Sequence, residues 1–211
     1  MDSKEFDQSS YKCNLADKLL RLKFSLEAIE YDRILKVLQF KNMHNTVHID
    51  EKWFYITKAS HRFYLTPGEV ETHGTCKSKK FIEKVMFMCA VCRPLFAPDE
   101  TVLFDGKIGI FPFTEWVPAK RSSKNRAAGT LEQKPIQSIK KQVIRDNFIH
   151  KIVPSIKLKW PSFASKTIFI QQDNAKPHIK DDDPEFREVA CADGFNIRIV
   201  HQPPNSPDTN Q

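Results

Sequence analysis

Apolar residues recur at intervals of three and four near the start of the chain. They fall at Leu15, Leu19, Leu22, Leu26 and Ile29. This spacing predicts one apolar face of a helix, which we expect to extend to Leu38. Lys and Arg side chains surround that face, so the helix is expected to pack on a core, with DNA contact as the alternative.

Segments rich in strand-forming residues follow the predicted helix. Residues 47–56 and 63–65 predict a hairpin, and residues 66–80 form a polar loop that contains Gly and Pro. Further extended segments are expected at 84–92 and 107–113. Three strands in a row favour antiparallel pairing, and the basic segment 117–130 is predicted to be a loop.

The second half of the chain alternates helices and strands. Residues 135–159 predict a helix that is broken or restarts near Pro154, and the apolar run 166–172 predicts a central strand. Asp183 followed by Pro184 predicts a helix start, and this helix should end near Gly194. A last strand is expected at 196–202. Strands separated by helices favour parallel crossovers, so we expect an α/β fold with a mixed sheet and helices around it.

Composition limits the classes of protein. The chain has 211 residues, of which 40% are hydrophobic and 28% charged, as is typical of one globular core. No apolar run is long enough to cross a bilayer, and the polar N-terminus does not resemble a secretory signal. The net charge of +7 favours a polyanionic partner such as nucleic acid, although a solvated basic surface explains the charge equally well.

Five cysteines invite a zinc hypothesis that the spacing does not support. His73, Cys76, Cys89 and Cys92 have a zinc-like spacing. Cys89 and Cys92, however, lie three residues apart in a predicted strand, where their side chains point to opposite faces. We therefore expect reduced thiols and no zinc site.

Two acidic residues stand out because each closes an apolar strand. Asp50 ends the run VHID, and Asp173 ends IFIQQD. If the two strands are neighbours, both carboxylates meet at one edge of the sheet. Carboxylates in such a place can hold a pair of divalent ions that cleave a phosphodiester. The alternative is that each Asp caps a turn.

The motifs around these acids decide between the two interpretations. HIDEKWF at 48–54 and IQQDNAKPH at 170–178 resemble the first two catalytic blocks of mariner-like transposases, and QPPNSPDTN at 202–210 resembles the approach to the third. KVMFMCAVCRP, GKIGIFPF, PAKRSSKNRAAGTLEQKPI and DGFNIRIV resemble the plant branch of that family. The resemblance covers residues 14–211, with the blocks in the family's order.

The resemblance implies a ribonuclease-H-like fold, with a mixed five-stranded sheet and flanking helices, that cuts and joins DNA. Asp50 matches the first catalytic acid and Asp173 the second, and both would bind two Mg²⁺ or Mn²⁺ ions. Glu51, Asn174 and His178 would act at most by positioning these ligands. The expected partners are DNA and a second transposase copy, in the nucleus. Neither a membrane nor a small-molecule substrate is expected.

The third acid of the family has no clear counterpart. Asp208 follows Asp173 with thirty-four residues between them, a spacing that the wider family uses. In the plant branch the third acid comes five residues after the Asp of Ser-Pro-Asp, which is two positions past Gln211. Asp208 is therefore interpreted as the turn residue, and the chain is expected to be truncated at both ends and inactive.

The expected organisation has three parts. Residues 1–12 are predicted to be disordered, 13–45 a helical lead-in, and 46–211 the catalytic domain without its last helix. Contacts with the DNA backbone are expected from Lys77, Lys79, Lys80, Lys120, Arg121, Lys124 and Arg126. Three hypotheses remain open: a degenerate transposase, a chain that still cleaves DNA through Asp208 or another acid, and a non-catalytic protein that binds DNA or transposase.

Overall fold

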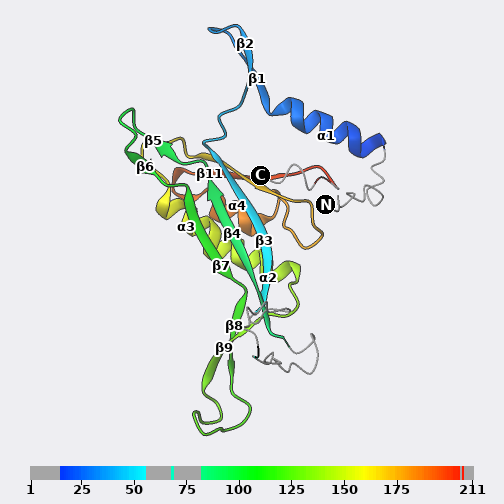
Figure 1. Cartoon of the computed structure of the whole chain (residues 1–211), viewed down its shortest axis with the longest axis vertical. Helices are drawn as coiled ribbons and strands as arrows, with labels where there is room; N and C mark the ends of the chain where they lie inside the picture. Colours follow the sequence, from blue (N-terminus) through cyan, green and yellow to red (C-terminus); the bar gives the residue numbers. More distant parts are fainter. Residues whose placement is uncertain (1–14, 56–67, 69–81, 205, 207–211) are drawn as a thin grey trace.

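A mixed five-stranded sheet forms the centre of the fold (Figure 1). The computed structural model describes residues 15–55, 68, 82–204 and 206. Its central strands are β3 (Thr46–Tyr55), β4 (Lys84–Cys92), β7 (Lys107–Pro112), β10 (Thr167–Gln172) and β11 (Asn196–His201). They lie in the order β11-β10-β3-β4-β7. β4 is antiparallel to both of its neighbours, whereas β10 and β11 run parallel to β3. This order and these directions are those of a ribonuclease-H-like fold, so the predicted fold class is confirmed.

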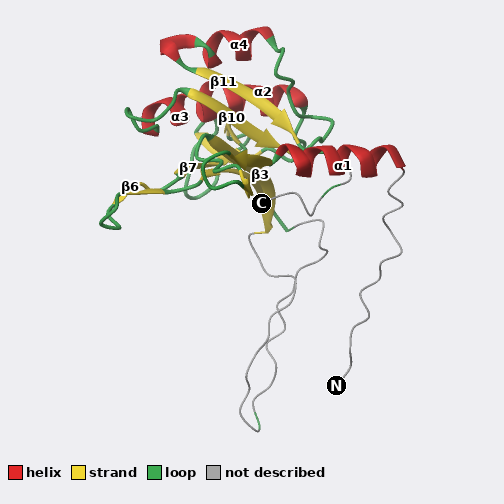
Figure 2. Ribbon diagram, turned by 90° about the horizontal axis from the view of Figure 1, so that it is seen from above, coloured by secondary structure: helices red, strands yellow, loops and turns green. Residues whose placement is uncertain are grey.

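Helices cover one face of this sheet (Figure 2). They are α2 (Lys141–Asn147), a π-helical segment (Phe148–Ile152), α3 (Val153–Lys159) and α4 (Pro184–Ala190). Alternate strand residues point toward the helices, and Val47, Ile49, Ile168 and Ile170 are buried in the same apolar cluster as Phe148. The residues between them point to the opposite face, which we call the outer face.

The long helix expected at 135–159 begins later than the sequence pattern indicates. Pro135 ends β9 (Leu131–Pro135), which pairs with β8 (Thr114–Pro118), and the helix begins at Lys141. The expected restart near Pro154 agrees with the structure, because α3 begins at Val153, directly after the π-helical segment. Pro154 lies in the first turn of α3, where a missing N–H costs little.

The predicted first helix differs from the structure in length and in packing. α1 (Leu15–Glu27) ends eleven residues before Leu38, and the hairpin of β1 (Ile29–Asp32) and β2 (Val37–Phe40) follows it. The hairpin turn is specified locally, because Asp32 Oδ1 accepts hydrogen bonds from the backbone N–H groups of Ile34 and Leu35. The expected packing on the core is wrong, since Leu15, Leu22 and Leu26 are each more than half exposed.

Two smaller hairpins extend from the sheet region. β5 (Leu95–Phe96) pairs with β6 (Val102–Phe104), and β8 pairs with β9. The β8–β9 hairpin and its connecting loop, residues 114–135, form an arm that projects away from the sheet (Figure 1). The loop expected at 117–130 begins later than predicted, because residues 117 and 118 belong to β8, and the remainder forms the end of this arm. None of the described helices is long and apolar enough to cross a membrane.

Candidate functional site

Asp50 and Asp173 follow paired residues of two neighbouring parallel strands. The register of β3 and β10 pairs Val47 with Ile170 and His48 with Gln171, where the pairing ends. Asp50 lies two residues after His48, and Asp173 lies two residues after Gln171, in the loop directly after β10; both acids are exposed. The expectation that Asp50 ends its strand is wrong, because β3 continues to Tyr55. The strands are neighbours, as expected, while the meeting of the two carboxylates and their assignment as metal ligands stay predictions.

The loop after β10 is organised around the Asp173 side chain. Asp173 Oδ1 accepts a hydrogen bond of 3.0 Å from the backbone N–H of Ala175. Gln172 is fully buried, and its Nε2 donates to the carbonyl oxygen of Ile179 at 2.9 Å. The segment between Asp173 and Ile179 is thereby closed into a compact turn, and Asn174 lies exposed within it. Asp173 does cap a turn, as the alternative interpretation of the sequence held, and its side chain is half exposed.

His178 connects this loop to β3. Its Nε2 lies 3.1 Å from Glu51 Oε1, and its Nδ1 lies 2.9 Å from Asp173 Oδ1 and 3.0 Å from the Asp173 carbonyl oxygen. Burial disfavours the charged imidazole, but the hydrogen bond and charge of Glu51, together with the oxygens of Asp173, outweigh burial and raise the pKa of His178. The structure therefore brings together two of the three residues expected to position the acids.

Three further side chains flank the acids. The sequence predicts no role for His48 or Gln171 and places Cys89 only in a zinc-like spacing. His48 and Gln171 pair with each other, each two residues before an acid, and Cys89 of β4 pairs with Asp50. Burial lowers the pKa of His48, which favours its neutral form. The signal that predicts these neighbours is the two-residue alternation of a strand counted back from Asp50 and Asp173, but it requires knowledge of the strand partners.

The two cysteines of β4 lie on opposite faces, as their spacing predicts. Cys92 is buried on the helix-covered face, where burial raises the pKa of its thiol to about 11. Cys89 is half-buried beside Asp50 on the outer face. His73 and Cys76, which completed the zinc-like spacing, lie outside the described residues.

Basic residues at the end of the arm are accessible. Lys120, Arg121 and Lys124 are exposed, as is Trp116 on β8. Arg126 is instead paired with Glu132 of β9 and only partly exposed, so it is the least available of the predicted phosphate contacts on the arm. Lys77, Lys79 and Lys80 lie outside the described residues.

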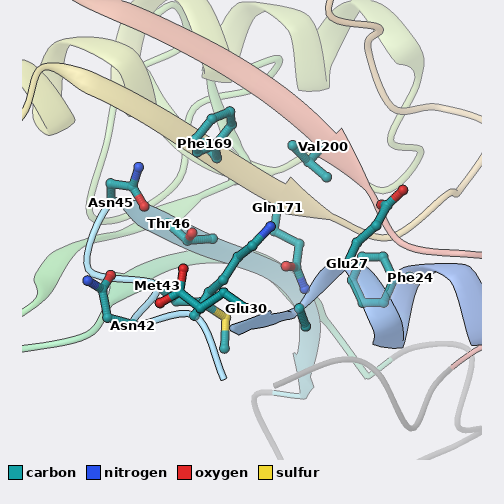
Figure 3. Close-up of a pocket in the computed structure, with 12 residues that line it drawn as sticks. Phe24, Glu27, Glu30, Asn42, Met43, Asn45, Thr46, Phe169, Gln171 and Val200 are labelled. Atoms are coloured by element: carbon teal, nitrogen blue, oxygen red, sulfur yellow. The ribbon is translucent and has the colours of Figure 1, made fainter. Parts of the chain in front are cut away.

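A pocket of about 560 Å³ lies between α1 and the sheet, and neither acid lines it (Figure 3). Phe24 and Glu27 of α1 line one side, and Phe169, Gln171 and Val200 of the sheet line the other. Gln171 precedes Asp173 by two residues and is the lining residue that lies nearest to it in sequence.

The donor chemistry of the two acids fits a hard divalent cation. Mg²⁺ prefers carboxylate oxygens and is commonly bound through one or two carboxylates, with water completing its coordination. Asp50 and Asp173 supply two such groups. In the part of the chain that the structure describes, no group of three or more His, Cys, Asp or Glu side chains is arranged to hold a metal ion, and Asp208 lies outside that part.

Comparison with known proteins finds similarity among solved structures. No protein-family model and no curated protein matches the chain. The Mos1 transposase paired-end complex with left transposon end has 15% identity and a TM-score of 0.47, over 99% of this chain and 48% of the other. The Mos1 strand transfer complex has 15% identity and a TM-score of 0.49, over the same shares. The Mos1 mariner paired-end complex with Mn has 15% identity and a TM-score of 0.45, over 96% of this chain and 47% of the other.

The chain thus spans about half the length of these transposase chains. At this degree of similarity we take from them neither an activity nor a partner. The fold assignment rests on the strand order and directions of the chain itself.

Proposed function

We propose that this chain carries the catalytic domain of a mariner-like DNA transposase, with residues 46–211 as that domain. Asp50 and Asp173 bind Mg²⁺ or Mn²⁺, which supplies the Lewis acid needed for phosphodiester chemistry. The substrate is DNA, the protein acts in the nucleus, and a second copy of the chain is a further partner. The observation that carries the proposal is the parallel pairing of β3 with β10, in which His48 pairs with Gln171 and each of these residues precedes one of the two acids by two positions.

The sequence motifs support this proposal independently of the register. Asp50 and Asp173 are the acids of the two blocks that resemble the mariner family, and the strand order matches the fold which that resemblance implies. Two carboxylates leave most of the six positions around Mg²⁺ to water. We therefore propose that the 211-residue polypeptide binds metal weakly and does not cleave DNA efficiently by these two groups alone.

Metal binding tests the site directly. Titration with Mn²⁺, followed by electron paramagnetic resonance of the free ion, should detect binding by the purified chain. Asp50→Asn and Asp173→Asn should each weaken this binding by at least about 10-fold, because each removes a charged oxygen ligand. The control is Asp146→Asn, which neutralises an exposed carboxylate on α2.

One result would contradict the metal site, and another would contradict only the expected lack of cleavage. Binding that is equal in Asp50→Asn, Asp173→Asn, Asp146→Asn and the unchanged chain would show that the two acids hold no ion. Nicking of supercoiled plasmid that depends on Asp50 would confirm the site and would refute the expected lack of cleavage.

A non-catalytic DNA-binding protein is the second candidate function. The accessible cations Lys120, Arg121 and Lys124, close to the exposed Trp116, favour it because they suit contact with phosphates and bases without any metal. DNA binding without dependence on Asp50, in a chain that binds no Mn²⁺, would favour this candidate over the transposase.

The arm gives a prediction about salt dependence. Changing Lys120, Arg121 and Lys124 together to Gln should weaken non-specific DNA binding and reduce the slope of log K against log salt by about 2 to 3, since each phosphate contact contributes about 0.9. Fluorescence anisotropy at several salt concentrations measures this slope. Neutralising the exposed Lys140, Lys151 and Lys180 makes the same change in net charge elsewhere. An equal loss in both triple variants would show that total charge, and not the arm, determines binding.

A further inference from the structure

His178 is a buried polar side chain that joins two different parts of the candidate site. Its side chain is 4% exposed, and that of Glu51 is 11% exposed. Burying such polar groups is costly unless they are hydrogen-bonded. Here both ring nitrogens lie within hydrogen-bond distance of oxygens, from Glu51 at one end and Asp173 at the other.

One end of this bridge contacts Glu51, the residue next to Asp50, and the other contacts Asp173 itself. Glu51 directly follows Asp50 on β3, so its side chain points to the helix-covered face while Asp50 points to the outer face. His178 therefore contacts Glu51, the residue next to Asp50, from the helix-covered face of the sheet. Its Nδ1 contacts the second acid itself, 2.9 Å from Asp173 Oδ1.

These contacts restrict how the Asp173 carboxylate can turn. Oδ1 is held by the Ala175 N–H at 3.0 Å and by His178 Nδ1. The ring is held in turn by Glu51, so its Nδ1 position is fixed relative to β3. Oδ2 takes no part in these contacts, and fixing Oδ1 determines its direction.

We propose that His178 is a positioning residue, anchored by Glu51, that sets the orientation of the Asp173 carboxylate relative to Asp50. The inference rests on the proposed function, since it assigns His178 a role in the site that Asp50 and Asp173 form. Groups that orient metal-binding side chains in this way commonly change metal affinity by about 10- to 100-fold when they are removed. The residue acts through Asp173 and does not itself bind the ion.

Two substitutions test the two contacts of His178 one at a time, because each keeps only one of them. In His178→Asn the side-chain amide nitrogen takes the place of Nδ1, so the hydrogen bond to Asp173 is kept. In His178→Gln the amide nitrogen takes the place of Nε2, so only the hydrogen bond to Glu51 is kept. We expect His178→Gln to weaken Mn²⁺ binding by about 10-fold, and His178→Asn to stay within about 3-fold of the unchanged chain.

The measurements compare Mn²⁺ affinity, by the same resonance titration, with the thermal midpoint of each variant. His150→Gln, at an exposed position of the helical layer, is the matched control and should leave affinity unchanged. A purely structural role predicts that affinity falls in proportion to stability in both His178 variants. The inference would be overturned if His178→Asn and His178→Gln lost equal Mn²⁺ affinity in proportion to their loss of stability. Unchanged Mn²⁺ affinity in His178→Gln would also overturn it.

Glu51→Gln provides a second test if His178→Gln does not fold. The amide oxygen can still accept from His178 Nε2, so the fold is retained while the anchoring charge is lost. We expect about 3-fold weaker Mn²⁺ binding, and no change would count against the bridge.

The same data distinguish this inference from the proposed function. Binding that requires Asp50 but is unaffected at His178 removes only the positioning role. Binding that does not require Asp50 refutes the proposed site and the inference together.

Discussion

Phe148→Ala should lower the free energy of unfolding by about 3 to 5 kcal/mol, which is the usual cost of emptying a large aromatic site in a core. Phe148 is fully buried in the π-helical segment. Its ring meets that of Phe186 on α4 edge to face, with centroids 6.3 Å apart. The Phe148 side chain therefore packs where α4 contacts the π-helical segment. We expect the cavity that Phe148→Ala leaves there to collapse only slightly.

Urea denaturation followed by circular dichroism measures this loss. Phe163→Ala is the matched control, because it removes the same atoms from a side chain that is 66% exposed, and it should change stability by less than about 0.5 kcal/mol. Should Phe148→Ala cost no more than Phe163→Ala, the helical layer would not pack on the sheet as described.

Asp183→Asn should destabilise the fold by about 2 kcal/mol at neutral pH, because it removes the charge that pairs with Arg145, whereas the Asn side chain can still cap α4. Asp183 is the N-cap of α4 and accepts from the Phe186 N–H at 3.1 Å. It also receives two hydrogen bonds from Arg145 of α2, at 2.9 and 3.1 Å. The substitution leaves the mostly buried Arg145 with Glu185 as its remaining ionic partner.

The pH dependence of this effect has a definite sign. The hydrogen bond from Arg145, helped by the Phe186 N–H and opposed by burial, lowers the pKa of Asp183 below its ordinary value of 3.8. A carboxyl group with a lowered folded-state pKa stabilises the fold above its unfolded pKa, and this stabilisation is lost as pH falls through the folded value. The difference between the unchanged chain and Asp183→Asn should therefore be constant near neutrality and shrink below about pH 4.

Thermal unfolding at a series of pH values tests this behaviour. Asp146→Asn removes an exposed carboxylate from the same helix as Arg145 and should show no comparable difference. If the difference in thermal midpoint between Asp183→Asn and the unchanged chain became larger in acid, Asp183 would not be the stabilising charge.

Local sequence patterns predicted the central strands well. The apolar runs that became β4, β10 and β11 are short, rich in β-branched or aromatic residues, and bounded by turn residues. Asp183 and Pro184 likewise predicted the start of α4, because capping depends on adjacent residues. These features depend on residues that are only a few positions apart, so they can be predicted from the sequence.

Errors arose where periodicity alone had to decide between a helix and a strand. Ile29 and Leu38 continue the apolar spacing of α1, yet they lie in the β1–β2 hairpin, whose turn is set by Asp32. The exposure of the Leu residues on α1 was also not predictable, because an apolar helix face does not reveal what it packs against.

The sequence by itself determined which two acids follow apolar strand-forming runs, which motifs surround them, and that the sheet is mixed. Only the tertiary structure decided that β10 pairs with β3 in the register that joins His48 to Gln171, and that β3 continues past Asp50 to Tyr55. It alone also decided that His178 turns inward to join Glu51 and Asp173, two residues that lie 122 positions apart. The physical reason is that strand ends and caps are local choices, whereas register and buried polar contacts depend on packing between distant segments, which no local pattern records.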